Sequence, residues 1–276
     1  MRTRFLSFFV LPVLLLSGIA HAAQQTSYYL ALGDSLAIGI QPSANGDVPT
    51  NQGYADDLYA VLHARAKGLS LAKLGCSGET TTSMIEGGIC TYAQGSQLAA
   101  ALEFLQTHNV SLVTIDIGAN DIDHCISVTG INTACVTAAL AAVETNLPQI
   151  LAALRSAAGP NTPIVGMNYY DPFLAAWVLV SNGQALAAES LQAANGFNSL
   201  LESIYQAFAI PVADVATAYR ISDFAQVPII KLPLNVFLTL TWTWMAAPAP
   251  LGPDIHPNAV GYAAIASAFA DKILVP

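Results

Sequence analysis

Three apolar, strand-forming runs in this chain each end in a glycine that is followed by small or polar residues. The runs cover residues 28–32, 69–74 and 110–117, and the glycines are Gly33, Gly75 and Gly118. Segments with helical spacing separate the runs, so the strands are expected to lie parallel in one sheet. The carboxyl ends of parallel strands meet at one edge, where open α/β folds place their sites. The residues after the three glycines are therefore the first candidates for a functional site.

The rest of the chain continues the alternation of strands and helices. Pro148 is expected to break one long helix, and residues 37–52, rich in Gly, Pro, Asn and Asp, to form a loop. The pattern predicts an α/β fold with about five parallel strands and helices on both faces. Helices are predicted over residues 54–67, 94–108, 132–158, 183–209 and in a terminal segment to about 272, and further strands over 163–167 and 210–215.

Residues 1–22 have the pattern of a secretory signal peptide. A basic start precedes an apolar run over residues 5–19, and residues 20–22 form the small-residue cleavage pattern Ala-His-Ala. The run is shorter than the ~20 residues that span a membrane, and an uncleaved N-terminal anchor is the alternative. We expect cleavage near Ala22, secretion to the extracellular space, and a single domain over residues 23–276, because no linker, repeat or charge block marks a boundary.

The exported part of the chain is strongly acidic. The full sequence has 9 basic and 18 acidic residues, and cleavage removes Arg2 and Arg4 but no acid. The resulting net charge of about −11 argues against nucleic acid or an anionic membrane as a partner. Only 10% of the residues are charged, so the surface carries many apolar groups. We expect a monomer that makes transient contact with apolar or lipid surfaces.

All four cysteines lie in the exported part, at Cys76, Cys90, Cys125 and Cys135. An even number in an oxidising compartment predicts two disulfides. The short separations favour Cys76 with Cys90 and Cys125 with Cys135 among the three possible pairings. A metal site is the rival interpretation, but the sequence has no C-x-x-C pair and no histidine at ligand spacing, so no metal ion is expected.

Residues 227–250 depart from the alternating pattern. Lys231 is their only charged residue, and Pro228 and Pro233 argue against a membrane-spanning helix. The segment is expected either to pack in the core or to form an insertion that flanks the site.

Ser35 follows the first strand on a tight turn, which is a position for a nucleophile. Alternatively, residues 33–35 form an ordinary turn in which Asp34 or Ser35 caps the next helix. A serine nucleophile needs a base within hydrogen-bond reach. His256, between an isoleucine and a proline in the loop before the last helix, is the best candidate, and His124 is the alternative. The other histidines lie in the signal peptide or in predicted helices.

A serine nucleophile also needs hydrogen-bond donors for the oxyanion that forms when it attacks. The sequence offers the N–H of Ser35, the N–H of Gly78 and the side-chain amide of Asn120. Each lies just beyond the end of a predicted strand, so residues distant in sequence can meet.

Four blocks of the chain, in this order, resemble the motifs of the SGNH hydrolases, also called GDSL lipases and esterases. The blocks are Gly33-Asp34-Ser35-Leu36, Cys76-Ser77-Gly78-Glu79-Thr80, Gly118-Ala119-Asn120-Asp121 and His256-Pro257-Asn258, and they bracket nearly all of the mature chain. The second block and the paired cysteines look more like the secreted bacterial lipases and esterases of this superfamily than like its carbohydrate deacetylases.

The resemblance implies a three-layer α/β/α sandwich with a flavodoxin-like parallel sheet. It also implies serine hydrolysis of esters or thioesters without a metal or an organic cofactor. Ser35 would be the nucleophile, Gly78 and Asn120 oxyanion donors, and His256 the general base.

The chain departs from the family pattern at the acid of the triad. The usual acid lies three residues before the histidine, where this chain has Pro253, whereas Asp254 lies two residues before it. Side chains two apart in an extended segment point the same way, so Asp254 can reach the imidazole. A backbone carbonyl is the alternative. Asp34 and Asp121 are interpreted as structural residues that accept hydrogen bonds from turn or helix N–H groups.

These observations predict a secreted serine hydrolase that cleaves carboxylic esters through an acyl-enzyme. The apolar residues 169–180 and 227–250 favour short- to medium-chain acyl esters or lipids. The alternatives are a carbohydrate acetylesterase, in which Trp242 and Trp244 could stack on sugars, and a non-catalytic protein that binds lipid or a surface.

Overall fold

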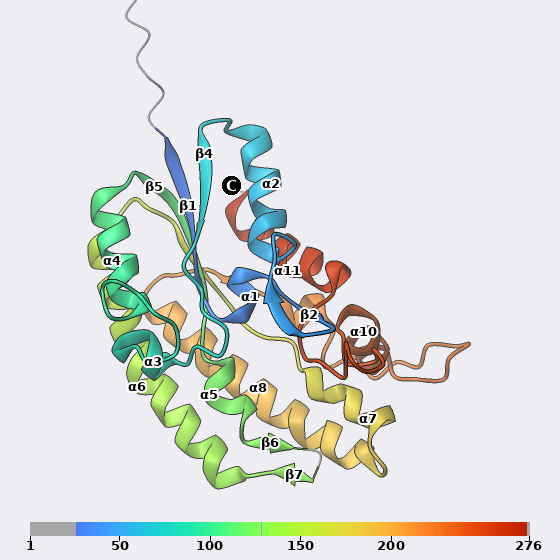
Figure 1. Cartoon of the computed structure of the whole chain (residues 1–276). Coiled ribbons are helices and arrows are strands. Elements are labelled where there is room, and N and C mark those ends of the chain that lie inside the picture. The colour runs from blue at the N-terminus through green and yellow to red at the C-terminus, as the bar shows by residue number, and fades with distance from the viewer. Residues whose placement is uncertain (1–25, 128, 275–276) are drawn as a thin grey trace, which may run out of the picture.

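The computed structural model of the chain describes residues 26–127 and 129–274. Five strands form one sheet in the order β4-β1-β5-β8-β9, and neighbouring strands run parallel (Figure 1). They are β1 (Ser27–Gly33), β4 (Leu69–Lys73), β5 (Val110–Asp116), β8 (Ile164–Met167) and β9 (Val212–Ala213). Because β1 lies between β4 and β5, the three strands that carry the candidate motifs are neighbours. The predicted signal peptide, residues 1–22, lies outside the described residues.

Helices cover both faces of the sheet. α2 (Tyr54–Arg65) and α11 (Ala259–Ile273) pack together on one face, where the rings of Tyr54 and Phe269 stack with centroids 4.8 Å apart (Figure 1). α4 (Gln97–Thr107), α6 (Thr133–Ala158) and α8 (Gly183–Ala207) lie in series on the other face. Residues 29–32 of β1 are completely buried, as expected for a strand covered on both sides. The predicted α/β fold with five parallel strands is confirmed.

The predicted break at Pro148 is wrong, because α6 runs without interruption from Thr133 to Ala158. Pro148 has no N–H, so the Glu144 carbonyl loses one helical hydrogen bond. Fully buried side chains on both sides of the proline, including Leu147 and Leu151, hold the helix in the core. α6 is long and apolar enough to cross a membrane by length and composition, and in this fold it packs against four other helices.

Two further local predictions are corrected. The expected loop over residues 37–52 contains the last part of α1 (Ser35–Ile38) and an antiparallel hairpin of β2 (Ile40–Ser43) and β3 (Gly46–Pro49). Such short elements depend on turns and on packing more than on a periodic pattern. The strand expected over 210–215 is reduced to the two residues of β9, because Asp214 caps the short helix α9 (Val215–Ala218) by accepting the Thr217 N–H.

Both predicted disulfides are confirmed. Cys76–Cys90 joins the loop after β4 to the segment that follows α3 (Thr81–Glu86), a helix that the sequence analysis missed. Cys125–Cys135 joins the residues after α5 (Ala119–Asp123) to the first turn of α6. Each bridge therefore fixes a connection that starts at the carboxyl edge of the sheet.

Residues 227–250 pack in the core in one part, as expected, and are exposed in another. α10 (Leu234–Trp242) buries Val236 and Leu238 and contacts the short 3-10 helix η1 (Pro172–Ala175). The loop before α10 instead extends into solvent, and Ile229 in it is 94% exposed (Figure 1).

Candidate active site

A small cavity at the carboxyl edge of the sheet brings together Ser35, Asn120 and His256. They come from the ends of β1 and β5 and from the loop before α11. The cavity has a volume of about 40 Å³. Its other lining residues are Asp34, Leu36, Ala119, Asp123, Tyr169, Tyr170, Pro172 and Ile255.

Close packing between β1 and β5 positions Ser35. Gly33 has a φ of +129°, and a Cβ at this position would lie 1.8 Å from the carbonyl oxygen of Asp116. Only glycine therefore allows the chain to turn directly into α1. Asp34 caps this helix, with Oδ1 accepting the Leu36 N–H at 2.9 Å, as the sequence analysis expected. Ser35 is the first residue of α1, so no helix carbonyl accepts its N–H.

His256 is held by the carboxylate two residues before it. Oδ1 of Asp254 accepts hydrogen bonds from the backbone N–H of His256 at 2.8 Å and from its Nδ1 at 2.9 Å. Burial raises the pKa of Asp254, but the hydrogen bond and the charge interaction with His256 outweigh it, and the pKa lies below its ordinary value. Oδ2 of Asp47, in β3, lies 3.8 Å from the same nitrogen. Because both carboxylates lie on the Nδ1 side, this arrangement favours a proton on Nδ1 and leaves Nε2 as the basic nitrogen.

No hydrogen bond joins the Ser35 hydroxyl to the His256 ring within the part of the chain that the structure describes, although both residues line the same cavity. Hydrogen bonds between a nucleophile and its base are often long without substrate and tighten when substrate binds.

Asn120 is bonded to Glu79, the residue that directly follows Gly78. The Asn120 amide donates to the Glu79 carbonyl at 3.0 Å, which ties the end of β5 to the loop after β4. Gly78 has a φ of +81° and open space around it. Asn120 lines the cavity, whereas Gly78 does not line it.

A buried polar network below the cavity was missed from the sequence. The Gln97 side chain accepts the Gly33 N–H at 2.7 Å and donates to the Gly33 carbonyl at 2.8 Å and to Glu79 at 2.9 Å. Glu79 also accepts a hydrogen bond from Ser83. Gln97 and Glu79 are 0% and 1% exposed, so both side chains depend on this network for their hydrogen bonds. The network fixes the turn that carries Ser35 relative to the Gly78 loop.

A second unpredicted feature is the pair of buried carboxyl groups of Asp34 and Asp116. Tyr54 donates to Oδ1 of Asp116, and the Asp34 N–H donates to its Oδ2 at 3.2 Å. Burial raises the pKa of Asp116 well above its usual range, and the neighbouring Asp34 carboxylate raises it further. The surroundings therefore favour the neutral form of Asp116, directly beneath the Ser35 turn. Asp121 plays the predicted structural part, since its carboxylate accepts the N–H and hydroxyl hydrogens of Thr81.

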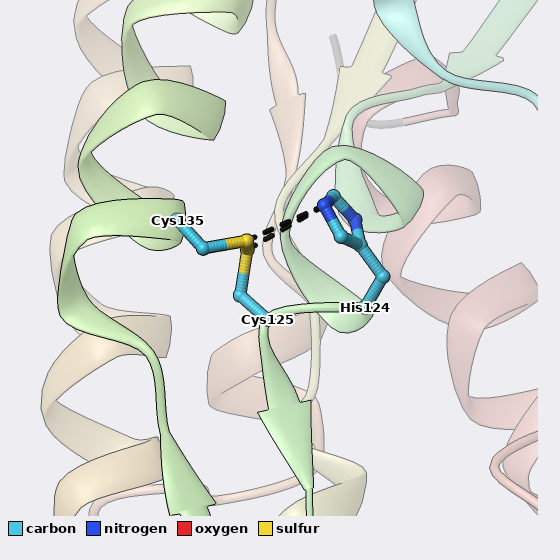
Figure 2. Close-up of side chains that lie close together, drawn as sticks. All are labelled: His124, Cys125 and Cys135. Carbon is cyan, nitrogen blue, oxygen red and sulfur yellow. Dashed lines mark hydrogen bonds between the residues drawn. A yellow bond between two sulfur atoms is a disulfide. The ribbon is translucent and has the colours of Figure 1, made fainter.

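The alternative base, His124, lies beside the Cys125–Cys135 disulfide. Figure 2 shows its ring against the disulfide, with Nε2 3.3 Å from the sulfur of Cys135 and 3.7 Å from that of Cys125. Cysteines joined in a disulfide offer no thiolate to a metal ion, so this cluster is a poor metal ligand set. His124 is exposed and does not line the cavity, and the geometry favours His256.

Two other cavities lie near this edge. A side cavity of about 40 Å³ shares part of its wall with the Ser35 cavity and is otherwise mostly apolar. A larger cavity of about 890 Å³ is lined by residues of α8 and α9 and contains neither Ser35 nor His256. Its buried Asn168 already donates to Asp214 at 2.9 Å and accepts the Ala216 N–H at 2.9 Å. The side cavity is lined by Ala119, Ile122, Asp123, Ile126, Tyr169, Asp171, Pro172, Phe173, Ser190, Ala193, Ala194 and Phe197.

Comparisons with known proteins agree with this geometry. The sequence model described as the GDSL-like lipase/acylhydrolase family matches residues 31–264. No curated protein matches the sequence.

Several solved structures share the fold. Phospholipase A1 from Streptomyces albidoflavus NA297 is 19% identical with a TM-score of 0.58, covering 89% of this chain and 98% of its own. An extracellular lipase from Streptomyces rimosus is 20% identical with a TM-score of 0.57, covering 88% of this chain and 99% of its own. An acetylxylan esterase from Geobacillus stearothermophilus is 17% identical with a TM-score of 0.55, covering 91% and 96%.

Proposed function

Because this chain belongs to the GDSL-like lipase/acylhydrolase family, we propose that it hydrolyses carboxylic esters with Ser35 as the nucleophile. The observation that carries the proposal is the convergence of Ser35, Asn120 and His256 on one cavity, with Asp254 bonded to His256. This set of groups supplies a nucleophile, a base, a carboxylate that orients the base, and donors for an oxyanion.

In the proposed reaction, Nε2 of His256 removes the proton from the Ser35 hydroxyl as its oxygen attacks the ester carbonyl. The charge that develops on the carbonyl oxygen is stabilised by the Asn120 amide and by the N–H groups of Ser35 and Gly78. His256 then gives its proton to the leaving alcohol, and an acyl group remains on Ser35. Water, deprotonated by His256, attacks this ester and releases the carboxylic acid and the free serine.

Asp254 is a positioning residue in this scheme. Its carboxylate accepts the Nδ1 proton at 2.9 Å and so stabilises the imidazolium that forms during each attack. The same oxygen also accepts the backbone N–H of His256, which fixes the distance between the two residues.

The side cavity supports acyl groups of short to medium length. It adjoins the Ser35 cavity and is lined largely by apolar side chains such as Ile122, Phe173 and Phe197. A volume of about 40 Å³ is too small for a long acyl chain, which would have to extend onto the surface.

An exposed apolar patch supports contact with lipid surfaces. In the loop before α10, the bridge between Gln226 and Pro233 closes a hairpin with Ile229 and Ile230 at its tip, and these are 94% and 46% exposed. Lys231 follows them directly. An apolar tip of this kind can enter the outer part of a lipid layer. Further exposed apolar side chains are Val178 and Leu179 of α7 (Ala176–Leu179) and Phe224, whose ring lies beside that of Trp177.

Secretion as one domain is part of the proposal. Two disulfides indicate an oxidising compartment, and the family match extends over residues 31–264 without a second module inside it. We propose that residues 23–276 form a secreted, monomeric enzyme.

The test is hydrolysis of nitrophenyl esters of increasing acyl length by the mature protein. Ser35→Ala is expected to lower kcat on the order of 10⁴-fold or more. The matched control is Ser77→Ala, which changes an exposed serine in the neighbouring loop. The optimum is expected at short to medium chains. Undiminished activity in Ser35→Ala would refute the mechanism, and activity confined to acetylated xylan would favour the carbohydrate acetylesterase.

A further inference from the structure

Asp123 is an acid in the wall of the active site that the proposed mechanism does not use. It is the last residue of α5 and lines both the Ser35 cavity and the side cavity. Ala119, one helical turn earlier, lines both as well, so this face of α5 forms the boundary between the two cavities.

The Asp123 carboxylate differs from the other acids in these walls. Asp171 accepts hydrogen bonds from the Ser190 hydroxyl at 2.8 Å and from the Phe173 N–H at 2.9 Å, and Asp34 caps α1. Among residues 26–127 and 129–274, none donates a hydrogen bond to the side chain of Asp123. A carboxylate that is partly buried without a donor is costly unless something else supplies the hydrogen bond.

The surroundings of Asp123 contain more negative than positive groups. Burial, followed by the carboxylates of Asp34 and Asp171, raises the pKa of Asp123 to about 7, although His256 acts in the opposite direction. Among the described residues, neither the carboxylate nor the neutral acid form of Asp123 has a hydrogen-bond partner.

We propose that Asp123 binds a hydroxyl group carried on the acyl chain of the substrate, so that the enzyme prefers hydroxyacyl esters to plain acyl esters. This inference rests on the proposed function, because it places the acyl chain in the side cavity. There the first carbons beyond the scissile carbonyl pass the face of α5 that carries Asp123.

A hydroxyl group fits this position better than the other candidates. It donates a hydrogen bond to the carboxylate and accepts one from the neutral acid, so it pairs with Asp123 in both protonation states. An ammonium group pairs only with the carboxylate and loses more hydration in a cavity whose other walls are mostly apolar. A second carboxylate on the substrate would be repelled by Asp34, Asp123 and Asp171 together.

The test compares ethyl 3-hydroxybutanoate with ethyl butanoate at about pH 8, using the ratio of their kcat/KM values. Because the same serine attacks both esters, the ratio cancels any general loss of activity. The wild-type protein is expected to prefer the hydroxy ester, and Asp123→Leu to lower the ratio about 10- to 100-fold. Asp123→Asn, whose amide still accepts a hydrogen bond, is expected to retain most of the preference.

An unchanged ratio in Asp123→Leu overturns the inference while leaving the proposed function intact. A wild-type protein that hydrolyses neither ester overturns both. A third substrate needs no variant: ethyl 3-methoxybutanoate has no O–H to donate and is expected to lose the preference. A methoxy ester that is cleaved as fast as the hydroxy ester also refutes the role of Asp123.

Discussion

Replacing Asp116 with asparagine is expected to make the stability of this protein less dependent on pH. Asp116 is completely buried and accepts a hydrogen bond from Tyr54, with the Asp34 carboxyl beside it. Burial and the neighbouring Asp34 raise its pKa well above its usual range, so folding favours its neutral form. In the unfolded chain the same group ionises at a pKa of about 3.9.

The size of the effect follows from this difference. A group whose pKa is raised on folding contributes its full stability below the unfolded pKa and loses it as the pH rises toward the folded pKa. Folding then takes up one proton at Asp116, and the free energy of unfolding falls by about 1.4 kcal/mol per pH unit.

Asparagine does not titrate, so Asp116→Asn removes this contribution. In the wild type, Oδ2 of Asp116 accepts the Asp34 N–H at 3.2 Å. An asparagine NH₂ group in this place cannot accept that hydrogen bond, and its loss lowers the free energy of unfolding by an amount that does not vary with pH. The slope of stability against pH is therefore the informative quantity. Asp34, Asp123 and Asp171 continue to titrate in the variant.

The assay is urea unfolding followed by tryptophan fluorescence at several pH values from 5 to 8, with both disulfides intact. The slope for Asp116→Asn is expected to be shallower than that of the wild type, by at most about 1.4 kcal/mol per pH unit. Asp271→Asn, which changes an exposed carboxylate on α11, is the control and is expected to leave the slope unchanged. Parallel curves for wild type and Asp116→Asn would show that Asp116 is ionised in the folded protein.

Two further predictions concern the site and the surface. Asp254→Asn is expected to lower kcat for ester hydrolysis on the order of 10²- to 10⁴-fold with little change in KM, because the amide no longer favours the tautomer with the proton on Nδ1. A loss smaller than about threefold would assign the orientation of His256 to a backbone carbonyl. The double variant Ile229→Ser and Ile230→Ser is expected to bind phosphatidylcholine vesicles about tenfold or more weakly in a sedimentation assay. The control is Val61→Ser, at an exposed position on α2. Equal sedimentation of the two variants would exclude the hairpin tip as the lipid contact.

The strands and the candidate residues at their ends could be predicted because they leave local signals. An apolar run followed by a glycine marks each of β1, β4 and β5, and parallel pairing then requires the three ends to meet. That rule brings Ser35 and Asn120 to one edge, and the loop before α11 adds His256 to the same cavity.

The polar groups that support the site leave no local signal. Gln97 and Glu79 are 18 residues apart, and Gln97 bonds to Gly33 across 64 residues. A buried glutamine within a helix rich in Ala and Leu has the same local pattern as an exposed one. Asp116 is similar, since it ends an apolar strand as an exposed acid would, and only the tertiary fold shows that it is buried. The unbroken helix at Pro148 has the same explanation, because its stability comes from packing rather than from its own sequence.

Ser35 and His256 come from opposite ends of the chain, so the cavity is complete only after the C-terminal segment has been synthesised. Ser35 is synthesised early, and His256 follows only after the strand β9 and the helix α10. α11 then packs with α2 on its face of the sheet, and the Tyr262 hydroxyl donates to the Ile40 carbonyl at 2.9 Å, just after α1. A nascent or C-terminally clipped chain holds every strand of the sheet but no base for Ser35. The ester hydrolase proposed above therefore has no complete site until its last segment is synthesised and packs in place.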